Sequence, residues 1–210
     1  MTDRAIDCHA HVIDQPRYPF AVGPGYKPLP HEHGPAEAYH AVLDAHGVEH
    51  ALLVQPSCYG TDNEAMLAAM RDAPRRFKGI AMVEPTWDER QLAALTEAGI
   101  VGTRFNLVVY KPDAVQAAAA SGLLGRMRAL GWFAQVFATD EQWAAIAEPL
   151  RRSGLQLLVD HFGTRETRAA LELPGFKAVL ALGREGRAAV KLSAPFRLAP
   201  ASGTYPAASA

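Results

Sequence analysis

The sequence is poor in the features that mark several large classes of protein. It has only two cysteines in 210 residues, too few for a disulfide framework. No apolar run approaches the roughly 18 residues of a membrane-spanning helix, and no signal peptide precedes the first strand-like run. Basic and acidic residues nearly balance, at 21 and 22, which disfavours nucleic acid or a membrane surface as a partner. We therefore expect a cytoplasmic protein with neither kind of partner.

A glycine-rich phosphate loop is also missing, because no G-x-G-x-x-G follows the first strand-like run. Its absence disfavours a doubly wound, nucleotide-binding sheet. What the chain does have is 49% apolar and 20% charged residues, enough for a hydrophobic core and unlike a disordered chain. The length is that of one ordinary domain, so we expect residues 1–210 to form a single domain.

One pattern recurs along the chain: a helical stretch ends in glycine, and an apolar run of strand length follows at once. The glycines are Gly47, Gly99, Gly131 and Gly154. Glycine just past a helix end adopts the left-handed cap that other residues resist. Capping boxes that predict helix starts occur at residues 61–64, 86–89 and 139–142.

Seven apolar runs are predicted to be strands, at residues 5–11, 51–55, 77–83, 101–105, 133–137, 155–160 and 188–192. Strands that alternate with helices imply a parallel sheet with right-handed crossovers. Seven units suit an open doubly wound sheet or a (β/α)₈ barrel without its last strand, and the missing phosphate loop favours the barrel. We expect an α/β fold of the (β/α)₈ TIM-barrel type with about seven of eight strands, incomplete at the C-terminus.

Three histidines stand where predicted strands end. His9 and His11 are two apart on the first strand, so both side chains face the same way, and His161 ends the sixth strand. In such folds the carboxyl ends of the strands form the active face. We expect His9, His11 and His161 to hold one small group, either a metal ion or a carbonyl oxygen. Cys8 is expected to point away from them, into the packed layer between strand and helix.

Arginines follow two other strand ends. Arg104 ends the fourth predicted strand, and Arg197 closely follows the seventh. A guanidinium is a rigid fork suited to carboxylates, so two of them at one face predict a small anionic substrate. The long segment 14–35, rich in proline and glycine, is predicted to be a loop over the site.

Five segments taken together resemble a known family, at residues 6–12, 54–63, 102–106, 160–161 and 190–194. In order and spacing they resemble the amidohydrolase-related family, most closely its branch of 2-pyrone-4,6-dicarboxylate lactonases and sugar lactonases. The resemblance runs from the first strand to about Arg197. It implies a (β/α)₈ barrel that opens a lactone with water.

The resemblance also assigns roles to individual residues. It implies that His9, His11 and His161 polarise the lactone carbonyl. Substrate carboxylates would be held by Ser57, Arg104 and Arg197, with Tyr26 and Tyr59 as further substrate-binding residues. The family's general base is an aspartate at the end of an eighth strand, usually in a Ser/Thr-Asp-Trp-Pro setting, and this sequence has no such motif. We therefore expect a C-terminally truncated chain.

Two alternatives to a lactonase without a cofactor stay open. One is a zinc-dependent amide or ester hydrolase on the same barrel, with His9, His11 and His161 as ligands of Zn²⁺. Metal-binding relatives place further ligands on middle strands, where this sequence has Arg104 and Gln135. A guanidinium repels a cation, which favours a site without metal. The other alternative is an inactive truncated remnant. The oligomeric state is left open.

Overall fold

The computed structural model describes residues 5–23, 26–163 and 170–195. Its strands are β1 (Ile6–Ala10), β2 (His50–Val54), β3 (Phe77–Ala81), β4 (Ile100–Asn106), β5 (Phe133–Phe137), β6 (Leu157–Val159) and β7 (Ala188–Val190). Its α-helices are α1 (Ala36–Ala45), α2 (Glu64–Asp72), α3 (Glu89–Glu97), α4 (Ala114–Ala120), α5 (Leu123–Ala129), α6 (Asp140–Ser153) and α7 (Pro174–Arg184). Short 3-10 helices are η1 (Pro30–Glu32), η2 (Ser57–Tyr59), η3 (His161–Gly163) and η4 (Ala170–Glu172).

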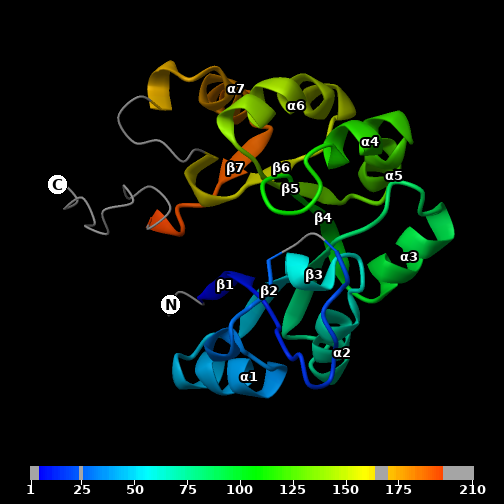
Figure 1. Cartoon of the computed structure of the whole chain (residues 1–210), viewed down its shortest axis with the longest axis vertical. Coiled ribbons are helices and arrows are strands. Elements are labelled where there is room, and N and C mark those ends of the chain that lie inside the picture. Colours follow the sequence, from blue (N-terminus) through cyan, green and yellow to red (C-terminus); the bar gives the residue numbers. More distant parts are fainter. Residues whose placement is uncertain (1–4, 24–25, 164–169, 196–210) are drawn as a thin grey trace.

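All the described strands are parallel and pair in chain order from β1 to β7. The sheet curls, and the helices ring its outer side, with β1 and β7 at its two edges (Figure 1). This arrangement follows from the alternation of strand and helix, because right-handed crossovers place every helix on the same side of a curling sheet. The expected α/β fold of the (β/α)₈ type with seven strands is confirmed.

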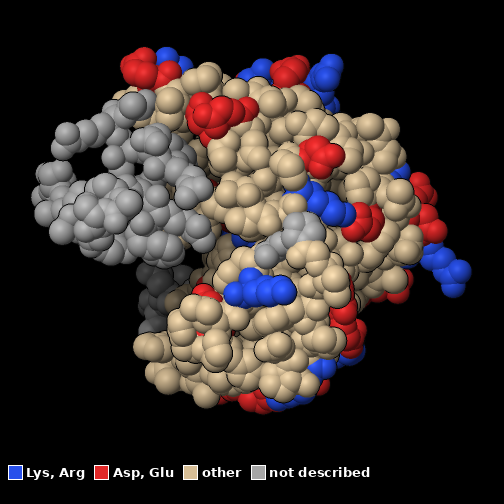
Figure 2. Space-filling model, viewed as in Figure 1, with Lys and Arg blue, Asp and Glu red and all other residues tan. Residues whose placement is uncertain are grey.

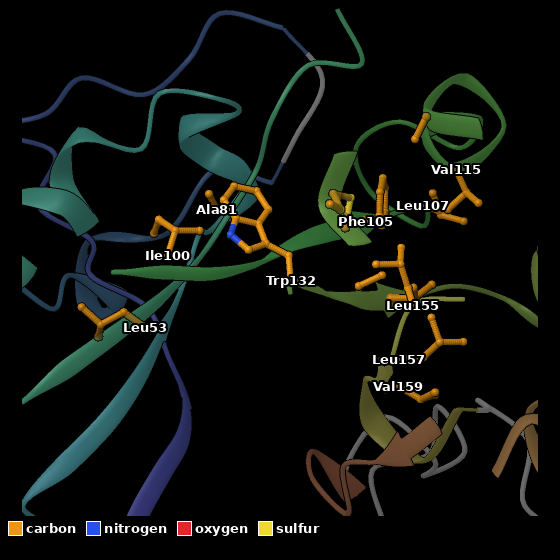
Figure 3. Close-up of a cluster of buried hydrophobic side chains, with 14 of the residues drawn as sticks. Leu53, Ala81, Ile100, Phe105, Leu107, Val115, Trp132, Leu155, Leu157 and Val159 are labelled. Carbon is orange, nitrogen blue, oxygen red and sulfur yellow. The ribbon is translucent and has the colours of Figure 1, made fainter. Parts of the chain in front are cut away.

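The hydrophobic core lies between the sheet and the helices. Trp143 and Ile146 of α6 are fully buried, as is Val136 on β5. Figure 3 shows part of this core, with Leu155, Leu157 and Val159 following one another along the sixth strand region. Burying each large apolar side chain stabilises the fold by roughly 1.5–3 kcal/mol, so this layer fixes the positions of the strand ends.

Local signals in the sequence set most helix ends. The four predicted cap glycines all have positive φ, from 64° at Gly47 to 97° at Gly99. The box predicted at residues 139–142 is confirmed, because the Thr139 side chain accepts the Gln142 N–H and the Gln142 side chain accepts the Thr139 N–H.

The other two predicted boxes are wrong in detail. Before α3 the box is formed by Asp88 and Gln91, two residues later than predicted. Before α2 the N-cap residue Asn63 makes no capping bond with its side chain, which instead bonds to the backbone of Met82. A tertiary hydrogen bond has thus replaced the local one.

The expectation for Cys8 is also wrong. Cys8 is exposed, as is Ile6, which is 57% exposed on the same strand. β1 is an edge strand among the described residues and pairs only with β2, so that face of it is not covered by a packed layer.

Charged side chains of both signs are intermingled on the surface seen in Figure 2. This agrees with the near balance of 21 basic and 22 acidic residues. No described helix is both long and apolar enough to cross a membrane.

Two glycines of α7 predict opposite effects of the same substitution. A Cβ at Gly175 would lie 2.0 Å from the backbone oxygen of Asp140 on α6, whereas a Cβ at Gly183 would meet nothing closer than 4.0 Å. We expect Gly175→Ala to lower the free energy of unfolding by about 1–3 kcal/mol, because two helices must separate. Gly183→Ala should raise it by up to about 1 kcal/mol through helix propensity. Urea unfolding measures the free energy of both variants. If Gly175→Ala unfolds with the same free energy as the unaltered protein, the close contact between the two helices is contradicted.

Candidate active site

Polar side chains from both edges and the middle of the sheet meet at the carboxyl ends of the strands. His9 comes from β1, Gln135 from β5, Asp160 directly follows β6, and Lys191 directly follows β7. The Lys191 ammonium lies 2.8 Å from Nδ1 of His9, so the first and last described strands meet here through their side chains. The layout agrees with the rule that parallel α/β folds gather function at this edge.

Asp160 is the centre of this cluster. Its side chain is fully buried, and Nε2 of Gln135 donates to both carboxylate oxygens at 3.0 Å. Nζ of Lys191 lies 3.2 Å from Oδ1, and Nε of Arg104 lies 3.7 Å from Oδ2. A buried carboxylate is tolerated only when it is paired and hydrogen-bonded, and here the two cations and one amide meet that need.

The three predicted histidines lie together. Nε2 of His9 is 3.4 Å from Nε2 of His11, and the rings of His9 and His161 have centroids 5.8 Å apart. Nδ1 of His11 lies 2.7 Å from the carbonyl oxygen of Val54 at the end of β2, which fixes that ring against the next strand.

An unusual backbone turn positions His161. His161, Phe162 and Gly163 all have positive φ, at 53°, 64° and 70°. Residues other than glycine pay roughly 1–2 kcal/mol for this conformation. The turn is held because Phe162 N–H donates to the Lys191 carbonyl at 2.9 Å and Nδ1 of His161 lies 3.1 Å from the Ser193 hydroxyl. It directs the His161 ring towards His9.

Arg104 joins the cluster from β4. Its side chain is buried, and Nη1 donates to the Gln55 carbonyl at 3.1 Å. Arg104 also lines a pocket of about 320 Å³, together with Glu84 and Lys111, which form an ion pair at 2.7 Å. Arg104 therefore contacts both the buried carboxylate and a space that can hold a small molecule.

The other predicted substrate-binding residues are placed less uniformly. Ser57 is buried and begins η2, which follows β2 after Gln55 and Pro56. Tyr59 is 2% exposed, and its hydroxyl accepts the Asp14 N–H at 2.8 Å, so it anchors the loop after β1. Tyr26 is 39% exposed and lies near Glu32 rather than in the histidine cluster. Arg197 lies outside the described residues.

Sequence reasoning gave no role to Asp160 or Lys191, although both stand at predicted strand ends. The signal available was a carboxylate directly before the strand-end histidine, and a lysine at the end of the next strand. Their pairing depends on the side-by-side placement of β6 and β7 and is not visible as a local pattern.

Comparison with known proteins identifies the family. The sequence pattern of the amidohydrolase family matches residues 6–210. The chain belongs to this family. It is 28% identical over 195 residues to a 2-pyrone-4,6-dicarboxylate hydrolase of Comamonas testosteroni, covering 92% of this chain and 63% of the relative. It is 27% identical over 204 residues to a 4-sulfomuconolactone hydrolase of Hydrogenophaga intermedia, covering 95% of this chain and 65% of the relative.

A solved structure is similar as well. It is described as a probable 2-pyrone-4,6-dicarboxylic acid hydrolase from Acinetobacter baumannii with citric acid bound. Its TM-score is 0.81 at 31% identity, covering 94% of this chain and 73% of that one. This amidohydrolase chain thus spans less than two thirds of the length of both curated relatives named above.

Burial and neighbouring cations keep the two strand-one histidines of this amidohydrolase neutral. Burial, followed by His11 and Lys191, holds the pKa of His9 far below its usual range. Burial and the Arg104 guanidinium lower the pKa of His11 to about 4, against weaker upward effects of the Val54 carbonyl and Asp160. Neutral imidazoles can each donate one hydrogen bond and accept one, so the pair suits uncharged or anionic groups.

The lowered pKa of His11 predicts a pH dependence of stability. The unfolded chain binds a proton on this histidine near pH 6.5, while the folded amidohydrolase binds it only near pH 4. His11 alone should therefore lower the free energy of unfolding by about 3 kcal/mol as the pH falls through this window, and His9, whose pKa is held lower still, adds to the same slope. Urea unfolding between pH 7 and 4 measures it. His11→Gln should reduce the slope without abolishing it, and His46→Gln, at an exposed position, should leave it unchanged. An unchanged slope in His11→Gln would contradict this origin.

The charges around the three histidines of this amidohydrolase bear on whether they could hold a divalent cation. Across the described ranges, no three His, Cys, Asp or Glu side chains are arranged to hold a metal ion. Nδ1 of His9 faces the Lys191 ammonium, and the Asp160 carboxylate already receives Gln135 and Lys191. A metal at the histidines would stand beside Lys191 and Arg104, whose charges oppose it.

Proposed function

We propose that the protein hydrolyses a small lactone that carries carboxylate or similar acidic groups, without a metal ion. The observation that carries this proposal is the pair of neutral histidines, His9 and His11, set beside the buried cations Lys191 and Arg104. Such a site favours an uncharged carbonyl at the histidines and an anionic group at the cations. The two curated relatives, named for a pyrone dicarboxylate and a sulfomuconolactone, support the same substrate class.

In the proposed reaction, water attacks the ring carbonyl and the ring C–O bond breaks to give the hydroxy acid or its keto tautomer. Charge develops on the carbonyl oxygen, and a preorganised N–H donor at that position is worth several kcal/mol in typical acyl-transfer sites. Arg104, which lines a pocket, would receive an acidic substituent of the ring. Binding of that substituent orients the carbonyl towards the histidines.

Hydrolysis with and without metal tests the proposal. The protein is freed of metal with a chelator, its metal content is measured, and ring opening of 2-pyrone-4,6-dicarboxylate and 4-sulfomuconolactone is followed by ultraviolet absorbance. We expect ring opening to persist in the metal-free protein and to be lost in His9→Ala. Activity that disappears on chelation and returns with zinc would instead support the zinc hydrolase, with His9, His11 and His161 as ligands. No ring opening by the folded protein would contradict the proposal.

A further inference from the structure

Three contacts link Lys191, the two strand-one histidines and β2 into one chain of hydrogen bonds. Nζ of Lys191 lies 2.8 Å from Nδ1 of His9. Nε2 of His9 lies 3.4 Å from Nε2 of His11, and Nδ1 of His11 lies 2.7 Å from the carbonyl oxygen of Val54. Both nitrogens of both rings are therefore engaged.

The chemistry at the two ends of this chain sets its direction. An ammonium only donates, so Nδ1 of His9 must accept from Lys191. A carbonyl oxygen only accepts, so Nδ1 of His11 must donate to Val54. A neutral imidazole has one N–H and one lone pair. The proton of His9 is thus on Nε2, the lone pair of His11 is on Nε2, and the contact between them runs from His9 to His11.

We propose that Lys191 is a positioning residue that fixes the tautomer of His9, so that His9 and His11 present one hydrogen-bond donor and one acceptor side by side. This deepens the proposed lactone hydrolysis and rests on it for its chemical purpose. The assignment also gives the two histidines different roles. When the reacting group replaces the 3.4 Å contact between the two Nε2 atoms, His9 donates to that group and His11 accepts from it.

The surroundings of Lys191 explain why this residue decides the tautomer. Its side chain is 8% exposed, and Asp160 holds the ammonium at 3.2 Å. Oδ1 of Asp160 also lies 3.7 Å from Nδ1 of His9. Nε2 of Gln135 lies 3.5 Å from the same nitrogen, but this amide donates to both Asp160 oxygens at the shorter distance of 3.0 Å. Without the ammonium, this carboxylate is the strongest acceptor near Nδ1 and would draw the His9 proton there. The two Nε2 lone pairs would then face each other, and the donor would be lost.

A donor beside an acceptor fits the adduct of the reaction better than the substrate. The planar carbonyl oxygen of a lactone only accepts, so it satisfies His9 alone. When one water adds across the C=O bond, a new C–O bond forms and the π bond breaks. One proton of the water stays on its oxygen and the other goes to the former carbonyl oxygen. The resulting carbon carries two hydroxyls, one able to accept from His9 and one able to donate to His11. Sites that fit the adduct better than the substrate accelerate the reaction.

Nitrogen-15 NMR of the full chain with labelled histidine measures the tautomers directly. The His9 and His11 signals are assigned by their loss in His9→Gln and His11→Gln. In the unaltered protein we expect the proton on Nε2 of His9 and on Nδ1 of His11. In Lys191→Met we expect the His9 proton to move to Nδ1. In Lys191→Gln, whose amide can still donate, it should remain on Nε2.

The control is Lys177→Met, which removes an exposed lysine paired with Glu172 at 3.1 Å and should leave both patterns unchanged. If Lys191→Met does not fold, Lys191→Leu, which also removes the donor, takes its place, and Lys191→Gln remains the variant that keeps a donor. A proton on Nδ1 of His9 in the unaltered protein, or the same His9 pattern in Lys191→Met, would overturn the proposal. The NMR measurement uses no lactone, so its result does not depend on whether the protein hydrolyses one. Where the lactone is turned over, Lys191→Met should lower kcat at least tenfold with little change in KM.

Discussion

Arg104→Ala is expected to slow hydrolysis of a dicarboxylated lactone by roughly 30-fold or more, since a lost buried partner of a carboxylate costs about 2–5 kcal/mol. A neutral ester of the same lactone should lose much less. The reason is that Arg104 lines a pocket and presents there a guanidinium that is held in place by the Gln55 carbonyl. Comparing kcat/KM on the two substrates gives the measurement.

Arg104 also has a structural role, so the comparison needs two controls. Arg104→Lys keeps the charge but loses the planar fork, and should recover only part of the rate on the anionic substrate. Arg187→Ala removes an arginine that likewise donates to a backbone carbonyl, that of Leu155 at 3.1 Å, but at the amino end of β7, away from the site. It should leave both rates unchanged. Equal losses on the two substrates in Arg104→Ala would assign Arg104 a purely structural role.

Asp160→Asn is expected to lower the free energy of unfolding by about 3–5 kcal/mol, the usual effect of breaking a buried ion pair from one side. The carboxylate is fully buried and lies within 4 Å of Lys191 and Arg104, so the substitution takes this negative charge away from two buried cations. Urea unfolding at pH 7 measures the loss.

Two further variants show whether the loss of stability is specific to Asp160 or follows the removal of any paired carboxylate. Glu172→Gln breaks the exposed pair with Lys177 and should change stability by less than about 1 kcal/mol. Asp160→Asn combined with Lys191→Met should be more stable than Asp160→Asn alone, because one uncompensated ammonium is gone. If Asp160→Asn is as stable as Glu172→Gln, the cluster does not depend on its buried carboxylate.

The strands were predictable because their signals are local. An apolar run behind a cap glycine predicted the strand at 133–137, and β5 spans Phe133–Phe137 as expected. The predicted strand at 155–160 shortens to Leu157–Val159, and at its C-terminal end this is because the chain turns left-handed at His161. The first predicted strand, at 5–11, ends at Ala10, so His11 lies just beyond it and still meets His9.

The contacts between distant residues were not predictable in the same way. Asp160 and Lys191 meet only because β6 and β7 are neighbours, and Lys191 reaches His9 only because the sheet curls. Neither contact produces a repeating pattern in the sequence from which it could be predicted. The exposure of Cys8 has the same origin, because alternation along a strand gives its two faces but not which of them is covered.

The left-handed turn at His161 and Phe162 lowers the stability of the fold while it positions the His161 ring in the candidate site. Glycine adopts a positive φ freely, so a glycine at 161 or 162 would relieve roughly 1 kcal/mol of strain. A library of variants selected only for thermal stability should therefore accumulate glycine at these two positions. Glycine at 161 removes the imidazole, and glycine at 162 removes the constraint that orients it. A library selected for turnover should keep the strained pair and recover its stability elsewhere, on the helices that ring the sheet.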